Sequence, residues 1–88
     1  MAKINFSKLP CYTDIRKVEK KEMDLKYDFS NQMYINGNGV AMGALAMKIY
    51  NSQGEEEYNE QECALMLQFS QSLPPIFVES LKDAIEGK

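Results

Sequence analysis

The middle of the chain carries the run Ala41-Met42-Gly43-Ala44-Leu45-Ala46-Met47, which is small and apolar on almost every side. With Val40 before it and Ile49 after it, the run has the spacing of an α-helix. Small side chains let neighbouring backbones approach closely, so we expect a central helix that is surrounded by others. The run is far shorter than the roughly 18 apolar residues of a membrane-spanning helix, and no membrane partner is expected.

On the N-terminal side of this run, Leu25, Phe29 and Met33 repeat at every fourth position and predict another helix. Asp24 is placed to cap that helix by accepting hydrogen bonds from its first free amides. We expect Gly37 to adopt left-handed backbone and to end it. Four methionines follow helical spacing and are assigned to the core: Met33, Met42, Met47 and Met66.

On the C-terminal side, Asn59 and Glu62 have the spacing of a capping box and predict a third helix over residues 60–71. Pro74 and Pro75 break that helix, and proline is well placed to begin the next one. The sequence therefore predicts four helices after residue 23.

Residues 1–23 lack helical spacing. Pro10 cannot continue a helix, and Ile4 and Phe6 alternate with polar neighbours as strand residues do. We therefore predict an extended, basic N-terminal arm, compatible with one or two short strands or with a docked coil. The predicted fold class is mainly α: a small bundle of about four helices, forming a helical domain over residues 24–88, preceded by this arm.

The length of the chain favours association with other proteins. Its 88 residues, 44% of them hydrophobic, allow one domain. A domain of this size buries only about 60% of the surface that its unfolded chain exposes. A second copy or another protein would cover part of the remaining apolar surface, so we expect self-association as a homodimer, or assembly with another protein.

Charge is distributed unevenly along the chain. Residues 3–26 carry seven lysines and arginines against four acids, whereas residues 27–88 carry three lysines against nine acids. Three interpretations remain open at this point: solvated faces, a basic arm that contacts an acidic body of its own or a neighbouring chain, and a basic arm that contacts nucleic acid. The candidate interaction residues are Arg16, Lys17, Lys20 and Lys21 in the arm and Glu55, Glu56 and Glu57 in the body.

The sequence is poor in residues that carry chemistry. It has no histidine, the usual general base at neutral pH. Cys11 and Cys63 lie far apart and form neither a CxxC motif nor a disulfide framework, so we assign Cys63 to the core. A calcium loop centred on Gly54 would place Ile49, which has no oxygen ligand, at its first position. We therefore predict no catalytic residue, no metal site, no cofactor and no small-molecule substrate: the chain is not expected to be an enzyme.

A resemblance adds to this reading. The chain contains the run Ala44-Leu45-Ala46-Met47-Lys48-Ile49-Tyr50-Asn51, an acidic turn, and a final helix that is led by Pro75. With these motifs, residues 40–85 resemble small helical proteins from phages, prophages and other bacterial mobile elements. Those proteins generally lack an assigned function, so the resemblance implies an accessory protein of such an element and carries over no site residue.

The sequence thus predicts a non-enzymatic protein–protein interaction or assembly module. The alternative is a small regulator that contacts nucleic acid through its basic arm. The first residues contain no apolar run of signal-peptide length, and we expect a cytoplasmic protein.

Overall fold

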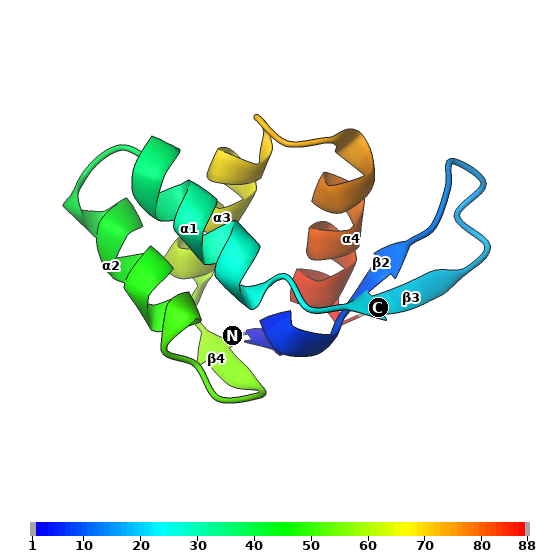
Figure 1. The fold of residues 1–88 in the computed structure, drawn as a ribbon, viewed down its shortest axis with the longest axis horizontal. Helices are drawn as coiled ribbons and strands as arrows, with labels where there is room; N and C mark the ends of the chain where they lie inside the picture. The colour runs from blue at the N-terminus through cyan, green and yellow to red at the C-terminus, as the bar shows by residue number, and fades with distance from the viewer. Residues whose placement is uncertain (1, 88) are drawn as a thin grey trace.

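The computed structural model describes residues 2–87 of the chain. Figure 1 shows helices α1 and α2 side by side toward one end of the molecule and the hairpin of strands β2 and β3 at the other end. In chain order, the elements within this range are β1 Ala2–Ile4, the 3₁₀ turn η1 Phe6–Lys8, β2 Leu9–Tyr12, β3 Lys20–Met23, α1 Lys26–Asn36, α2 Val40–Tyr50, β4 Glu56–Tyr58, α3 Glu60–Ser70 and α4 Pro75–Glu86.

The predicted mainly α fold class is wrong, because the fold is α+β. The sequence predicts the four helices correctly, but every strand within residues 2–87 is paired, β1 with β4 and β2 with β3. Three of these strands lie in the segment predicted as an arm. The buried side chains of that segment belong to the same core as those of the helices: Ala2, Ile4, Phe6, Leu9 and Cys11.

Strands β1 and β4 join the first described residues to the segment before α3. They run antiparallel, with Ala2 opposite Tyr58 and Ile4 opposite Glu56. Side chains alternate between the two faces of a strand, so Ala2, Ile4 and Tyr58 are buried while Lys3 between them is exposed. The sequence gives little sign of β4, because glutamate is depleted in strands and the pairing joins positions more than fifty residues apart.

Strands β2 and β3 form an antiparallel hairpin. Leu9 and Cys11 of β2 point into the core, whereas β3 is exposed along its length. The amide of Thr13 donates to the carbonyl oxygen of Glu19, so bonded and non-bonded pairs alternate from that point. Pro10 then falls at a non-bonded pair opposite Glu22, where its missing N–H costs no ladder hydrogen bond.

An aromatic cluster holds the N-terminal segment against the helices. The ring of Phe6 stacks on that of Phe29 in α1, with centroids 5.3 Å apart, and meets Tyr58 of β4 edge-on at 5.9 Å. Phe29 also contacts Phe69 of α3 at 6.0 Å and Phe77 of α4 at 5.2 Å. Such pairs stabilise a core beyond the area that they bury, so Phe6 and Phe29 link both ends of the chain.

The start of α3 confirms the predicted capping box, whereas the predicted cap of α1 is wrong. The Asn59 side chain accepts from the Glu62 amide at 2.8 Å, and the Glu62 carboxylate accepts from the Asn59 amide at 2.9 Å. Helix α1 begins at Lys26, and its N-cap position is Leu25. The Asp24 carboxylate accepts from the Lys26 amide at 3.3 Å. Lys26 is the first residue of the helix, whereas an N-cap side chain accepts from the second or third helical amide.

Gly37 is required for a reason other than the predicted one. Its φ is −77°, which is not left-handed backbone. A Cβ atom at this position would lie 2.3 Å from the Met33 carbonyl oxygen and 2.5 Å from Cγ of Met42. The glycine therefore lets α2 turn back closely against the end of α1.

We predict that Phe6→Ala lowers the free energy of unfolding by about 3–5 kcal/mol, because the ring is fully buried against Phe29 and Tyr58. Urea denaturation measures the effect. The control is Ile15→Ala on the same segment, which is exposed and should change stability by less than about 0.5 kcal/mol. A Phe6→Ala variant as stable as the unmodified chain would contradict this packing.

The hydroxyl group of Tyr58 is buried without a hydrogen-bond partner among residues 2–87. The Ser52 hydroxyl lies near it but donates its own hydrogen to the Ile49 carbonyl oxygen at 2.6 Å. Burial raises the pKa of Tyr58 to about 12, and the opposing effect of Ser52 is smaller. Ionisation of this phenol in the folded chain is therefore disfavoured at neutral pH.

We predict that Tyr58→Phe leaves the fold intact and raises stability by up to about 1 kcal/mol, since it removes a buried polar group that lacks a partner. Thermal or urea unfolding tests this. A loss of more than about 1 kcal/mol would mean that the hydroxyl makes a stabilising hydrogen bond.

Candidate protein-interaction surface

Two of the four predicted basic residues contact the chain's own last helix. The ammonium of Lys17 lies 2.7 Å from the Glu79 carboxylate, and that of Lys20 lies 3.2 Å from the Asp83 carboxylate. Both acids belong to α4, within the acidic body of residues 27–88, and neither is one of the candidate residues Glu55, Glu56 and Glu57. The basic hairpin therefore lies against an acidic helix of the same chain, and much of its charge is neutralised there.

Further contacts fix the base of the hairpin on α4. The Tyr12 amide donates to the Ser80 hydroxyl at 3.0 Å, and the Tyr12 hydroxyl donates to the Asp83 carboxylate. The hydrogen bond to Asp83 is the main reason that the pKa of Tyr12 is raised. This contact contributes stability below the ordinary tyrosine pKa of about 10, and the contribution is lost as the pH rises through the higher pKa of folded Tyr12.

The other two basic residues are not held by α4 ion pairs. Arg16 lies in the loop between the strands and contacts Asp14 at 2.6 Å, and this hydrogen bond lowers the pKa of the Asp14 carboxyl. Its side chain remains largely exposed to solvent. Lys21 lies on the exposed strand β3.

The predicted acidic residues lie far from the hairpin. Glu56 and Glu57 belong to β4, and Glu55 precedes it in the turn that follows α2. Figure 1 shows this turn and the hairpin on different sides of the molecule. The structure therefore does not bring the predicted basic and acidic sets together within one chain.

A different surface stands out on α1 and α2, which we call the tyrosine groove. It is a groove of about 180 Å³ between the two helices, and its rim carries large side chains that are about half exposed. Met47, predicted as a core residue, is 45% exposed here, so that assignment is wrong. The lining residues are Tyr27, Ser30, Asn31, Tyr34, Ala46, Met47 and Tyr50.

The shape of the groove follows from residue size. Ser30 and Ala46 are buried between the helices and are small enough to let the two backbones approach. The Ser30 hydroxyl donates to the Lys26 carbonyl oxygen of its own helix, so the polar group at the floor is satisfied. Tyr27 and Tyr50 meet across one end, with ring centroids 6.3 Å apart. The result is an uncharged, preformed depression with aromatic walls.

Gly43 extends this surface along α2. It lies one helical turn before Met47, and a Cβ atom at this position would meet nothing within 4 Å. Glycine within a helix costs about 1 kcal/mol relative to alanine. Packing among residues 2–87 therefore does not require a glycine at position 43. The open space at its backbone lies beside the groove.

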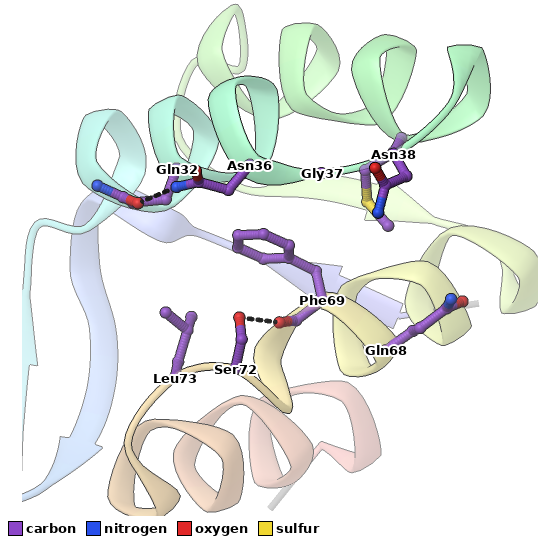
Figure 2. A pocket seen from close by; sticks show the side chains of 9 residues that line it. Gln32, Asn36, Gly37, Asn38, Gln68, Phe69, Ser72 and Leu73 are labelled. Atoms are coloured by element: carbon purple, nitrogen blue, oxygen red, sulfur yellow. Dashed lines mark hydrogen bonds between the residues drawn. The ribbon is translucent and has the colours of Figure 1, made fainter.

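A second cavity, shown in Figure 2, lies between the end of α1 and the end of α3 and encloses about 500 Å³. Three of its polar side chains are hydrogen-bonded nearby: the Asn36 amide donates to Gln32 at 2.7 Å, and the Ser72 hydroxyl donates to the Phe69 carbonyl oxygen at 2.9 Å. The residues that line it are all uncharged, which leaves it without a general acid or base: Gln32, Asn36, Gly37, Asn38, Met42, Gln68, Phe69, Ser72 and Leu73.

The cysteines are placed for packing. Cys11 and Cys63 are both buried, which confirms Cys63 as a core residue, and burial raises the pKa of each thiol. A thiol with a raised pKa is a poor nucleophile at neutral pH. Ile49, the residue that would open a calcium loop, is fully buried. Among residues 2–87 no three cysteine, aspartate or glutamate side chains gather as metal ligands would.

Comparison with known proteins finds no family model, no curated protein and no solved structure that matches the chain. None of the helices within residues 2–87 has both the length and the apolar character needed to cross a membrane. The functional argument below rests on the chain's own residues.

We predict that Asp83→Asn loosens the hairpin while the helical core stays folded, because it removes the charge that Lys20 and Tyr12 contact. Hydrogen exchange of the Tyr12 and Thr13 amides should speed up by about threefold or more, while amides of α3 are unaffected. Glu55→Gln, an exposed acid away from the hairpin, is the control. Equal exchange at Tyr12 in the two variants would contradict the role of Asp83.

Proposed function

We propose that this chain is a non-enzymatic protein–protein interaction module that assembles with further copies of itself through the tyrosine groove. One observation carries the proposal: three tyrosines and a methionine surround an uncharged groove on a face that residues 2–87 leave exposed. Tyrosine and methionine are enriched in the cores of protein interfaces, where charged residues are depleted.

The exposed area of the groove supports an interface of modest size. A buried aromatic side chain removes about 150–250 Å² from water, so the four half-exposed side chains offer on the order of 400 Å². A standard interface takes about 800 Å² from each partner. The groove therefore supplies about half of such an interface, and its surroundings would supply the polar rim.

Charge does not prevent a second copy from binding at the groove. The chain has a net charge of −3, so two copies repel each other weakly at long range. An uncharged contact surface avoids burying any of that charge.

We further propose that the chain assembles in the cytoplasm. The resemblance of residues 40–85 implies that it is a subunit encoded by a phage or another mobile element.

Nucleic acid is the less favoured partner. Lys17 and Lys20 are already engaged by acids of α4, so fewer cations are available to neutralise phosphates. Helix α3, which follows α2 as a recognition helix would, begins with Glu60 and Glu62. These carboxylates would face a phosphate backbone with the same sign of charge.

We predict that the mass of the chain in solution rises above that of the 10.1 kDa monomer as its concentration increases, and that Met47→Glu prevents this rise by placing a charge in the groove. Sedimentation velocity or light scattering measures the mass. The control is Val40→Glu, the same added charge at an exposed position outside the groove, which should leave association unchanged.

A chain that stays monomeric up to about 1 mM, a concentration at which even a weak interface would be populated, would contradict self-assembly. Equal loss of association in Val40→Glu and Met47→Glu would show that added charge, and not the groove, is responsible.

A further inference from the structure

We infer that copies of this chain associate head to tail, with the tip of the β2–β3 hairpin of one copy seated in the tyrosine groove of the next. The hairpin tip is the loop of residues 13–19. The inference rests on the proposed function, since it names the surface that fills the groove. It differs from the homodimer predicted from the sequence, because the two contacting surfaces are different parts of the chain.

The hairpin tip presents two apolar side chains to solvent. Ile15 is 92% exposed and Val18 is 73% exposed, the largest exposures among the bulky apolar side chains of residues 2–23. Figure 1 shows the loop that carries them projecting beyond the helices. A loop that is only a connection favours polar residues, so two branched apolar side chains at its tip need a partner surface to leave water.

The hairpin tip is held in one conformation before any partner binds. The Lys17 amide donates to the Asp14 carbonyl oxygen at 3.1 Å, and the Arg16 amide donates to the Asp14 carboxylate at 3.0 Å. Lys17 adopts left-handed backbone, with a φ of 57°, and its ammonium is anchored on Glu79 of α4. A preorganised loop loses little conformational entropy on docking.

The groove matches the hairpin tip in size and in polarity. Its volume of about 180 Å³ accommodates one or two branched aliphatic side chains between aromatic walls. Ile15 and Val18 bring apolar surface without a charge that the groove would have to satisfy. The rigid rings of Tyr27 and Tyr50 close one end of the groove and provide flat surfaces for such side chains to contact.

No charge opposes the contact. The residues that line the groove carry no charge, so its lining does not repel the tip. At the tip, Arg16 lies between Ile15 and Val18 and contacts Asp14 at 2.6 Å, and Lys17 contacts Glu79 at 2.7 Å. These cations therefore already have partners within their own chain, and the apolar side chains make the contact with the groove.

The positions of the two surfaces require a second copy. The molecule measures 37 Å along its longest axis, and Figure 1 shows the hairpin at one end of this axis and α1 with α2 toward the other. The tip therefore cannot reach its own groove. A contact between two different surfaces leaves one free tip and one free groove on every pair, so assembly continues to a ring or an open filament.

Mixing two complementary variants tests this arrangement. Ile15→Ser/Val18→Ser removes the apolar tip and keeps the groove, and Met47→Glu blocks the groove and keeps the tip. Both sets of residues are exposed, so both variants should fold, which circular dichroism verifies. Val40→Ser is the matched control, because Val40 is 91% exposed and does not line the groove. Sedimentation velocity is recorded for each protein alone and for the 1:1 mixture.

The unmodified chain and Val40→Ser should form species larger than a dimer as concentration rises. Each of the two surface variants alone should stay monomeric, and their mixture should form a complex of two chains and nothing larger. Raising the ionic strength should leave that complex largely intact, because an apolar tip meets an uncharged groove and salt screens contacts between exposed charges.

A tip variant that still self-associates like the unmodified chain would overturn the head-to-tail arrangement while leaving self-assembly through the groove intact. A mixture that stays monomeric would overturn it as well. An unmodified chain that never exceeds the mass of a monomer would overturn both this inference and the proposed function.

Discussion

The stacking of Phe6 on Phe29 is the contact on which the rest of the structure depends. It fixes which face of α1 points inward, because Phe29 and Met33 must lie over the N-terminal segment. The opposite face of α1 then carries Tyr27 and Tyr34 outward. No helix or strand of residues 2–87 covers that face, so the same contact that completes the core leaves the tyrosine groove open.

The small core also explains why the basic hairpin is both anchored and exposed. Strand β2 buries Leu9 and Cys11, whereas β3 is exposed along its length and contacts β2, the turn η1 and, through Lys20, helix α4. The base of the hairpin is therefore fixed, and its tip extends past the helices. A rigid projection at one end and a preformed groove toward the other give a small protein two distinct contact surfaces without enlarging its core.

Local features of the fold could be predicted from the sequence, and long-range ones could not. The capping box of Asn59 and Glu62 depends on residues three positions apart, and the four helices follow from apolar spacing. The sequence does not predict strand β4, because its partner β1 lies more than fifty residues away and its own sequence begins with two glutamates. The requirement for Gly37 depends on Met42 of the next helix, which no local pattern reveals.

The candidate surface was predictable only in part. Helical spacing placed Met47 on an apolar stripe, but which side of α2 faces the core is decided by the position of α1. The sequence shows the basic residues of the arm, but the acids that contact Lys17 and Lys20 belong to α4, more than sixty residues along the chain. The sequence shows Ile15 and Val18 as branched apolar residues in a charged stretch. That both side chains are exposed follows only from the projecting hairpin, which the sequence does not predict.

The most direct measurement is an intermolecular paramagnetic relaxation experiment. Glu19→Cys places one reactive thiol at the hairpin tip, since Cys11 and Cys63 are buried with raised pKa values. This variant is spin-labelled at residue 19 and mixed with an unmodified, isotope-labelled chain that carries no spin label. The account predicts that the amide signals of residues 27–34 and 43–50 in the isotope-labelled chain broaden. Broadening confined to the hairpin, or none at all under conditions where the chain associates, would contradict it.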